Sequence, residues 1–193
     1  MPSDKVTISP IFRSETTASE NPFTDIHAED YYYDAVLWAA QKGVTGGTSD
    51  TTFTPDGACT RAQAVTFLWR AAGSPEPKTL SSFADIPADS YYAKAVAWAV
   101  ENGVAKGVSD TLFAPDTTCT RAQIVTFLWR AQQSPSAGSA NPFADISADA
   151  YYADAVLWAV ENGVAKGMSS TAFAPDANCT RAQIVTFIYR CMK

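Results

Sequence analysis

An arginine recurs at a position where its charge is unfavourable unless it has a negative partner. It follows the threonine in Cys-Thr-Arg-Ala-Gln, a sequence found at 59–63, 119–123 and 179–183. Threonine three residues before glutamine predicts a capping box, so the arginine would be the first residue of a helix. A cation there faces the positive end of the helix dipole, at a cost of about 0.3–1 kcal/mol. Because a helix start also offers free N–H groups, we expect Arg61, Arg121 and Arg181 to hold an anionic ligand.

These arginines also have a structural interpretation, in which each one pairs with a nearby carboxylate. The candidate carboxylates are Asp25, Asp85 and Asp145. Another set of arginines lies near the other end of the same helices, where a cation suits the dipole, so we predict a structural role for them. They are Arg70, Arg130 and Arg190.

The elements that position the motif arginines come from a threefold repeat, whose starts read NPFTDI, SSFADI and NPFADI. We assign the repeats to residues 21–73, 81–133 and 141–193, and expect them to form one folded unit. Residues 1–20 match no repeat and are expected to be a poorly ordered leader or linker.

Each repeat is predicted to contain two helices joined by a long loop. The first begins near a tyrosine pair and ends at a glycine followed by valine, which is typical of a left-handed C-terminal cap. The second begins at the capping threonine and is apolar nearly all round, so it belongs in the interior. The predicted class is all-α (mainly helical), with three tandem two-helix repeats forming a pseudo-threefold trimer around a central three-helix bundle. A linear solenoid of helix pairs is the alternative.

Three of the four cysteines precede the capping threonines, where a small buried hydrophobic residue would pack. That position favours burial of Cys59, Cys119 and Cys179 over a metal site, since no histidine lies nearby in sequence. The tryptophans of both helices recur at helical spacing and are expected in the core. Tyr31, Tyr91 and Tyr151, which lead the first helices, are better placed to lie against the apolar face of a sugar.

Composition excludes several classes of function. The net charge is −6 and the pI is about 4.7, which argues against nucleic acid as a partner. The sequence has no run of eighteen apolar residues, which a membrane-spanning helix would need. The opening residues lack the apolar segment of a secretory signal. A histidine-centred enzyme would depend on His27 alone, and a glycosidase on paired loop aspartates such as Asp25 and Asp56. We therefore predict no catalytic residues, no metal site and no cofactor.

The repeated motifs together resemble the S-layer homology repeat. They are Phe-(Thr or Ala)-Asp-Ile, an aromatic-led helix ending in Gly-Val, Gly-x-Ser-x-x-x-Phe-x-Pro-Asp, and Thr-Arg-Ala-Gln. The resemblance covers residues 21–193 and implies a three-lobed molecule with ligand grooves between the lobes. It carries the family's motif arginine onto Arg61, Arg121 and Arg181, its loop glycine onto Gly47, Gly107 and Gly167, and its leading aromatic onto Tyr31, Tyr91 and Tyr151. The family usually has glutamate where Gln63, Gln123 and Gln183 stand here, and this departure bears on glycan preference.

The expected function is a non-catalytic anchor that binds an anionic, pyruvylated secondary cell-wall polysaccharide outside the cell, as the resemblance implies. Lys106 and Lys166 precede the loop glycine in the second and third repeats, where the first repeat has Gly46. If loop and helix start share a groove, these lysines add positive charge to it and the three sites are unequal; otherwise they are solvated surface residues. The alternative function is a surface adhesion or self-assembly module that binds other surface proteins.

Overall fold

The computed structural model describes residues 21–193, and this part of the chain contains six helices and no sheet. The helices are α1 (Tyr33–Gln41), α2 (Arg61–Ala71), α3 (Ala93–Glu101), α4 (Arg121–Ala131), α5 (Ala153–Glu161) and α6 (Arg181–Met192). The predicted all-α class is confirmed. The leader predicted at residues 1–20 lies outside the described residues. Within 21–193, no helix is both long enough and apolar enough to cross a bilayer.

Local sequence signals set the helix boundaries. The first helix of each repeat begins at the residue directly after the tyrosine pair. It ends two residues before Gly43, Gly103 or Gly163, whose φ angles of 67–68° are the left-handed conformation predicted for a C-terminal cap. Each second helix begins at the motif arginine, and all three have both hydrogen bonds of the capping box. Because these signals are local, the sequence predicts the boundaries closely.

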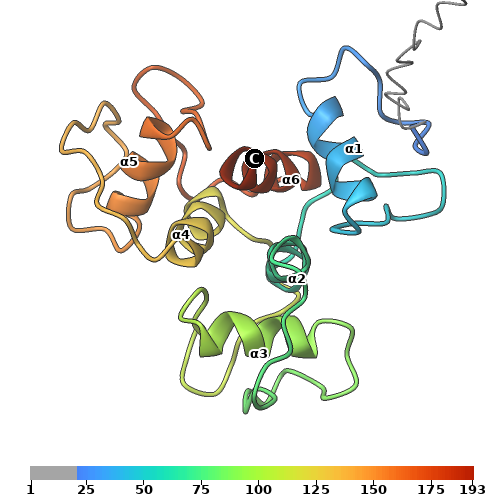
Figure 1. Cartoon of the computed structure of the whole chain (residues 1–193). Helices are drawn as coiled ribbons and strands as arrows, with labels where there is room; N and C mark the ends of the chain where they lie inside the picture. The colour runs from blue at the N-terminus through green and yellow to red at the C-terminus, as the bar shows by residue number, and fades with distance from the viewer. Residues whose placement is uncertain (1–20) are drawn as a thin grey trace, which may run out of the picture.

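The second helices meet at the centre of the molecule, and the first helices lie outside them (Figure 1). α2, α4 and α6 contact one another, and each also packs on the first helix of another repeat: α2 on α3, α4 on α5, and α6 on α1. Each lobe therefore combines helices from two repeats. Since α6 contacts both α1 and α2, the last repeat closes onto the first, and the linear alternative is wrong.

The core runs continuously through the three lobes. The second helices supply much of it, including Val65, Ile124 and Ile188, which are fully buried. The three motif cysteines are fully buried free thiols, as predicted. Their backbones also form a ring that the sequence did not predict. Each cysteine N–H donates to the carbonyl of another, at N···O distances of 2.8–3.1 Å.

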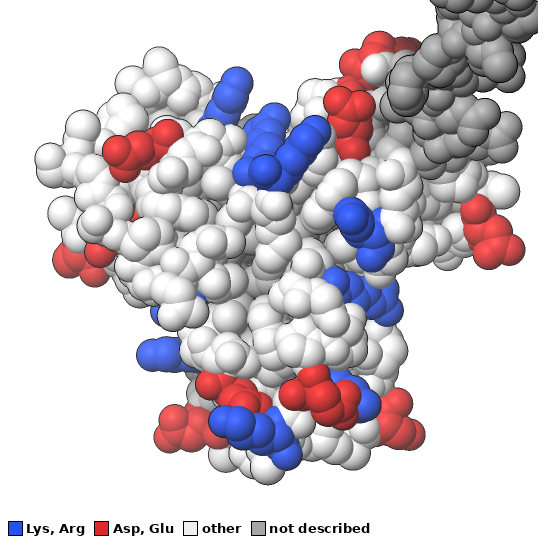
Figure 2. All heavy atoms as spheres, in the orientation of Figure 1, with Lys and Arg blue, Asp and Glu red and all other residues white. Residues whose placement is uncertain are grey.

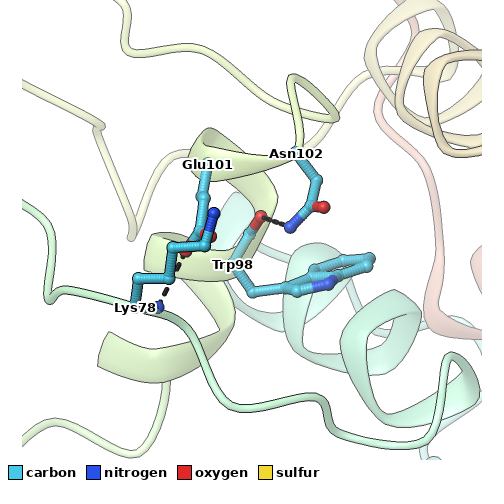
Figure 3. Close-up of polar contacts among 4 residues, drawn as sticks. All are labelled: Lys78, Trp98, Glu101 and Asn102. Atoms are coloured by element: carbon cyan, nitrogen blue, oxygen red, sulfur yellow. Dashed lines mark hydrogen bonds and ion pairs between the residues drawn. The ribbon is translucent and has the colours of Figure 1, made fainter.

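The connections between repeats are tied to the lobes that they join. The indole N–H of Trp69 donates to the carbonyl of Pro75 at 2.8 Å, and Trp129 makes the same bond to Pro135. The first connection is also fastened to α3 (Figure 3): the Lys78 backbone N–H donates to the Glu101 carboxylate at 2.9 Å, and the Lys78 ammonium lies 3.5 Å from it. These bonds fix where each new repeat begins relative to the last.

Candidate functional site

Each motif arginine is buried and held by a loop of another repeat. For Arg61 and Arg121 this is the following repeat, and for Arg181 it is the first. Arg61 is only 4% exposed. Its Nε donates to the Phe113 carbonyl and its Nη2 to the Lys106 carbonyl, both at 3.0 Å. The guanidinium carbon lies 4.7 Å from the ring centre of Phe113 and 5.6 Å from that of Phe127. Cation–π contacts on two sides and two fixed acceptors give the guanidinium one orientation.

The other two arginines repeat this arrangement with one difference. Arg121 donates to the carbonyls of Phe173 and Lys166 at 2.9 and 2.7 Å. Arg181 donates to the Phe53 carbonyl at 2.9 Å, but its Nη2 meets the hydroxyl of Thr45 at 3.4 Å instead of a backbone carbonyl. Both guanidinium groups lie between two phenylalanine rings, as Arg61 does. The chain therefore builds three related sites around one axis.

The expectation of free helix N–H groups is wrong. The backbone N–H of Arg61 donates to the Thr117 carbonyl at 2.8 Å, and that of Ala62 donates to the Pro115 carbonyl at 3.0 Å. The third N–H, of Gln63, donates to the capping hydroxyl of Thr60. The same bonds recur at α4 and α6. Carbonyls of a neighbouring loop thus satisfy the helix start, and an anion there must be held by side chains.

The predicted carboxylate partners of the arginines do something else. The Asp25 carboxylate accepts hydrogen bonds from the backbone N–H groups of Phe53 and Thr54, at 2.8 and 2.7 Å. Asp85 and Asp145 hold the equivalent loops in the same way. Within residues 21–193 the only ion pairs are Lys78–Glu101 and Lys94–Glu76, so the predicted arginine–aspartate pairs are wrong.

The aspartate and arginine environments shift their pKa values. Desolvation acts to raise the pKa of Asp25 and Asp145, but the backbone N–H groups that they accept outweigh it and lower the pKa below its ordinary value. Burial lowers the pKa of Arg61, Arg121 and Arg181. A guanidinium pKa is so high at the outset that each arginine keeps its charge at neutral pH.

Part of each guanidinium stays available to a ligand. Among the described residues, Nη1 of Arg61 has no hydrogen-bond partner. In residues 21–193 every fully buried polar side-chain atom has a hydrogen-bond partner. Because Nη1 has none, it is not fully buried and reaches the surface. It opens into a groove of about 510 Å³. The groove is lined by Arg61 of the first repeat, by Lys106, Gly107, Val108, Gln123, Thr126, Phe127 and Arg130 of the second, and by Tyr151 of the third.

A second groove, of about 370 Å³, surrounds Arg181. Its lining comes from Thr45, Gly46, Gly47, Thr48, Gln63, Thr66, Phe67 and Arg70 of the first repeat, Tyr91 of the second and Arg181 of the third. Neither groove is lined by any acidic side chain. By the repeat, the residues that would surround Arg121 come from the third repeat, with Tyr31 from the first. Tyr31 lies close enough to Arg121 and Arg190 for their positive charges to act on its pKa.

The structure brings together most of the residues that the sequence singled out. Tyr91 and Tyr151 line the two grooves and are more than 60% exposed, as is Tyr31. Lys106 is an exposed residue of the Arg61 groove, and the backbone carbonyl of Lys166 holds Arg121.

The loop glycines have a steric role as well as a place in the grooves. A Cβ on Gly107 would lie 2.4 Å from the Ser109 carbonyl oxygen, and one on Gly167 would lie 2.5 Å from that of Ser169. Gly47, at φ +83°, is equally crowded by Thr52. Only glycine fits at these positions.

Sequence reasoning missed two kinds of groove residue. Arg70 and Arg130 were assigned a structural role because a cation suits the end of a helix, yet they line the grooves. The sequence predicts Gln63 and Gln123 as helix caps, and the family resemblance connects them with glycan preference, but neither places their amide groups in the grooves. The side-chain oxygen of each does accept from the capping threonine, but the amide nitrogen has no partner among the described residues. Helical periodicity offered a signal, because Gln63, Thr66 and Arg70 stand at i, i+3 and i+7 and therefore share one face of α2.

Positive charge gathers between the lobes. In Figure 2 the lysine and arginine side chains cluster over α6 and in the gap between the lobes of α5 and α1, while most acidic side chains lie on the outer parts of the lobes. The Arg61 and Arg181 grooves are also positive, since their linings contain cations and no acidic side chain, in a chain whose net charge is −6.

The described residues were also compared with what a metal site or a reactive thiol requires. Residues 21–193 contain no group of three or more His, Cys, Asp or Glu side chains that could hold a metal ion. Burial raises the pKa of Cys59 and Cys179 to about 12, so these thiols stay protonated and weakly nucleophilic at neutral pH.

Comparison with known proteins agrees with the repeat. The S-layer homology domain matches residues 22–65, 82–125 and 142–185. Over 179 residues, the chain is 34% identical to the Surface-layer 125 kDa protein of Lysinibacillus sphaericus. The match covers 91% of this chain and 15% of that protein. It is 25% identical over 91% of its length to an S-layer protein of Bacillus thuringiensis subsp. finitimus, covering 22% of that protein. It is 28% identical over 88% of its length to an endoglucanase of Bacillus sp. (strain KSM-635), covering 18% of that protein.

The three matched segments fall at the same place in each predicted repeat and together span more than half of the chain. The chain spans less than a quarter of the length of each of these relatives. From its repeated motifs, its three equivalent sites and these matches, the chain belongs to the S-layer homology domain family and contains three tandem copies of that domain.

Proposed function

We propose that this chain is a non-catalytic anchoring module that works outside the cell by holding an anionic, pyruvylated secondary cell-wall polysaccharide in the grooves between its repeats. The observation that carries the proposal is the lining of the grooves. Each has two or three cationic side chains and no acidic one, in a chain of net charge −6. A groove lined by one sign of charge concentrates ligands of the opposite sign.

The Arg61 guanidinium is preorganised for a carboxylate in the absence of a ligand. Two of its nitrogens are already bonded and its plane is fixed between two rings, so little side-chain freedom is lost on binding. Its open Nη1 and the nearby Lys106 and Arg130 then supply charged donors.

The rest of the groove suits a sugar. The amide nitrogen of Gln123 is a donor for a hydroxyl, and the exposed ring of Tyr151 is a flat apolar surface beside it. A glutamate in place of Gln123 would bring negative charge into the groove, so glutamine favours an anionic ligand. Several linked sites on one polymer raise the effective affinity well above that of a single groove.

The same lining supports a binding role without turnover. General acid–base catalysis of glycoside hydrolysis needs carboxyl groups or an equivalent base beside the bond. Neither groove has a carboxylate or histidine in its lining. The relative named as an endoglucanase is much longer than this chain, so in it the matching segment is a small part of the protein.

The test is co-sedimentation of the chain with purified cell-wall sacculi, before and after acid stripping of the secondary polysaccharide. We expect binding to intact sacculi, loss of binding on stripping, and weaker binding at high salt. Removing Lys106, Arg130, Lys166 and Arg190 as the glutamine variants should reduce binding at least tenfold. These side chains are at least partly exposed and hold no hydrogen bond to another described residue, so they can be changed without opening the core.

The control removes two lysine charges away from the grooves, as Lys42→Gln with Lys94→Gln, and is compared with Lys106→Gln with Lys166→Gln, which removes two lysine charges at the arginine sites. Neither Lys42 nor Lys94 lines either groove. Binding that survives stripping, or equal loss of binding in the control variant, would show that the chain recognises something other than an anionic polysaccharide in its grooves.

A further inference from the structure

A groove of about 550 Å³ lies on the lobe of α5, and it shares no lining residue with the Arg61 and Arg181 grooves. One wall is the connection that enters the third repeat, and the other wall is α5. The lining consists of Gly138, Ser139, Ala140, Asn141 and Pro142 from the connection and Leu157, Val160 and Glu161 from α5. It contains apolar side chains and one carboxylate but no cation, so this α5 groove suits a different ligand from the arginine grooves.

The second repeat has the same groove in a smaller form, with a volume of about 330 Å³. Its walls are the connection that enters the second repeat, α3 and one loop residue. The lining consists of Thr79, Leu80, Ser81, Ser82, Phe83, Ala97, Val100, Glu101 and Asp110. Most of these positions lie 60 residues before those of the α5 groove, so the two grooves are equivalent and can be compared position by position.

The glutamate of each groove differs in its partners. Glu101 accepts from the backbone N–H of Lys78 at 2.9 Å, and the Lys78 ammonium lies 3.5 Å from its other oxygen (Figure 3). Glu161 keeps the backbone bond, from Gly138 at 3.1 Å, but a glycine supplies no ammonium. Among residues 21–193, the second oxygen of Glu161 has no hydrogen-bond or ion-pair partner. The complement of the α5 groove is therefore an apolar segment with a cation beside it.

The chain carries a segment of that kind at residues 5–13, which read Lys-Val-Thr-Ile-Ser-Pro-Ile-Phe-Arg. The cations Lys5 and Arg13 stand at its two ends, and residues 1–20 have no others. The large apolar residues between them are Val6, Ile8, Ile11 and Phe12. Residues 14–20 read Ser-Glu-Thr-Thr-Ala-Ser-Glu, a polar composition that is typical of a linker.

The attachment point of this segment favours the groove of another molecule. The leader joins the described chain at residue 21, in the lobe of α1, whereas the groove lies on the lobe of α5, on the other side of α6 (Figure 1). An extended chain from residue 13 to residue 21 spans at most about 28 Å. Because a compact chain of this size is about 40 Å across, a linker of that length reaches a neighbouring molecule more readily than another lobe of its own.

We propose that residues 5–13 of one molecule dock in the α5 groove of a second copy, so that the chain associates with itself. The apolar side chains of the segment lie along Leu157 and Val160, and one of its two flanking cations pairs with Glu161. Because the leader and the groove are different surfaces, the contact is head-to-tail and continues from molecule to molecule. The arginine grooves stay open, since the two kinds of groove share no lining residue.

Sedimentation velocity of the full chain tests the association. We expect the average mass to rise above the monomer value of 20.7 kDa as the protein concentration increases. The leader variant, Ile8→Ser with Phe12→Ser, should associate at least about tenfold more weakly, because it removes two apolar side chains that the contact buries. The control is Val108→Ser with Met168→Ser, which removes two exposed apolar side chains outside the α5 groove and should leave association unchanged.

A groove variant converts the third repeat to the form of the second, as Gly138→Lys with Ala140→Leu. These are the residues that stand at 78 and 80. Gly138 has no positive φ, and an added Cβ would meet only the Glu161 carboxylate, at 3.3 Å, so the connection accepts the change. The new lysine pairs with Glu161 and the new leucine occupies part of the groove. We expect this variant to associate at least about tenfold more weakly than the parent chain.

Mixing the two variants shows which molecule supplies the leader. Each variant alone should stay monomeric at concentrations where the parent chain associates. An equal mixture should form a one-to-one complex of twice 20.7 kDa, because the groove variant supplies an intact leader and the leader variant an intact groove. The thermal unfolding midpoint of each variant checks that the fold is retained.

A parent chain that stays monomeric at every concentration would overturn the inference, and so would a mixture of the variants that forms no complex. Association that survives in the leader variant belongs to another surface and contradicts the proposed contact. Co-sedimentation with sacculi is a separate measurement, so either proposal can fail while the other stands.

Discussion

At the scale of single residues, the motif arginine joins two tasks. It links one repeat to the next through carbonyls that lie 45 and 52 positions further along the chain, and it leaves one nitrogen open to the groove. The unfavourable position at a helix start is offset because carbonyl oxygens of the neighbouring loop surround that helix end. The fold therefore depends on this side chain, and under the proposed function ligand binding depends on it as well.

Arg61→Ala is predicted to lower the free energy of unfolding by about 2–4 kcal/mol, since it leaves the buried carbonyl of Phe113 and the part-buried carbonyl of Lys106 without this donor. Urea denaturation followed by tryptophan fluorescence measures it. Arg70→Ala is the control, because that residue makes one long hydrogen bond of 3.4 Å. Equal stability of the two variants would contradict a linking role for Arg61. Loss of binding in Arg61→Ala alone would not distinguish a ligand contact from a damaged fold.

Gly107→Ala is predicted to destabilise the chain by about 1–3 kcal/mol, because the new methyl group would meet the carbonyl oxygens of Ser109 and Leu112 at 2.4 and 2.7 Å. Gly46→Ala, at the position with open space in the first repeat, should be neutral or slightly stabilising. Thermal unfolding midpoints of the pair give the comparison. A Gly107→Ala variant as stable as Gly46→Ala would show that the loop adapts.

At the scale of elements, the long loops are held to the start of their own repeat by a carboxylate. Asp25 accepts from two consecutive backbone N–H groups 28 and 29 positions away. This contact closes the loop that bears the groove wall and presents the Phe53 carbonyl to Arg181. The aspartate of the repeat start thus positions the arginine site of another repeat without touching the arginine.

The pH dependence of stability follows from these carboxylates. Because the pKa of Asp25 and Asp145 is lower in the folded chain than the ordinary value of 3.8, both stabilise the fold above about pH 4. That stabilisation is lost as the pH falls below 3.8 towards the lowered folded value. The double variant Asp25→Asn with Asp145→Asn should be less stable than the parent at pH 7, and the difference should shrink at pH 3.

Urea midpoints at the two pH values measure this effect. The control is Asp50→Asn with Asp110→Asn, exposed loop aspartates whose side chains accept no hydrogen bond from the described residues. A difference between parent and double variant that is as large at pH 3 as at pH 7 would mean that the charge of the carboxylates contributes nothing.

At the scale of the whole molecule, the repeats are interlocked and not merely adjacent. Each second helix packs on a first helix from another repeat, and the backbone ring of Cys59, Cys119 and Cys179 takes one residue from every repeat. No groove can form from a single repeat, since the Arg61 groove needs Arg61, Lys106 and Tyr151 together. The closed fold and the Arg61 groove therefore both depend on contacts between repeats.

Residues 21–193 are predicted to unfold in one transition, and a fragment of residues 21–133 should not fold. The fragment lacks α5 and α6, so α4 and α1 lose their main partners and expose their apolar faces. Near-UV circular dichroism and urea denaturation of both chains measure this. As a control, a circular permutant opened between residues 73 and 81, with residues 193 and 21 joined by a flexible linker, keeps every helix pair and should fold. A cooperatively folded 21–133 fragment would contradict the interlocked arrangement.

The sequence by itself determined what is local. The capping threonines, the glycines at the ends of the first helices and the buried cysteines were predicted because each depends on residues within a few positions of itself. The arginines were predicted as site residues on equally local grounds, since a cation at a helix start is visible in one short motif, and that prediction remains to be tested.

Only the tertiary structure decided what the arginines contact and which helices pair. The acceptors of Arg61 are backbone carbonyls, which every residue has and which leave no mark in a sequence. Likewise, α1 is apolar on the face that packs on α6, but nothing in its residues says that the partner comes from the last repeat and not from its own. The closed packing of all three repeats sets this pairing, because only a closed arrangement buries the second helix of every repeat.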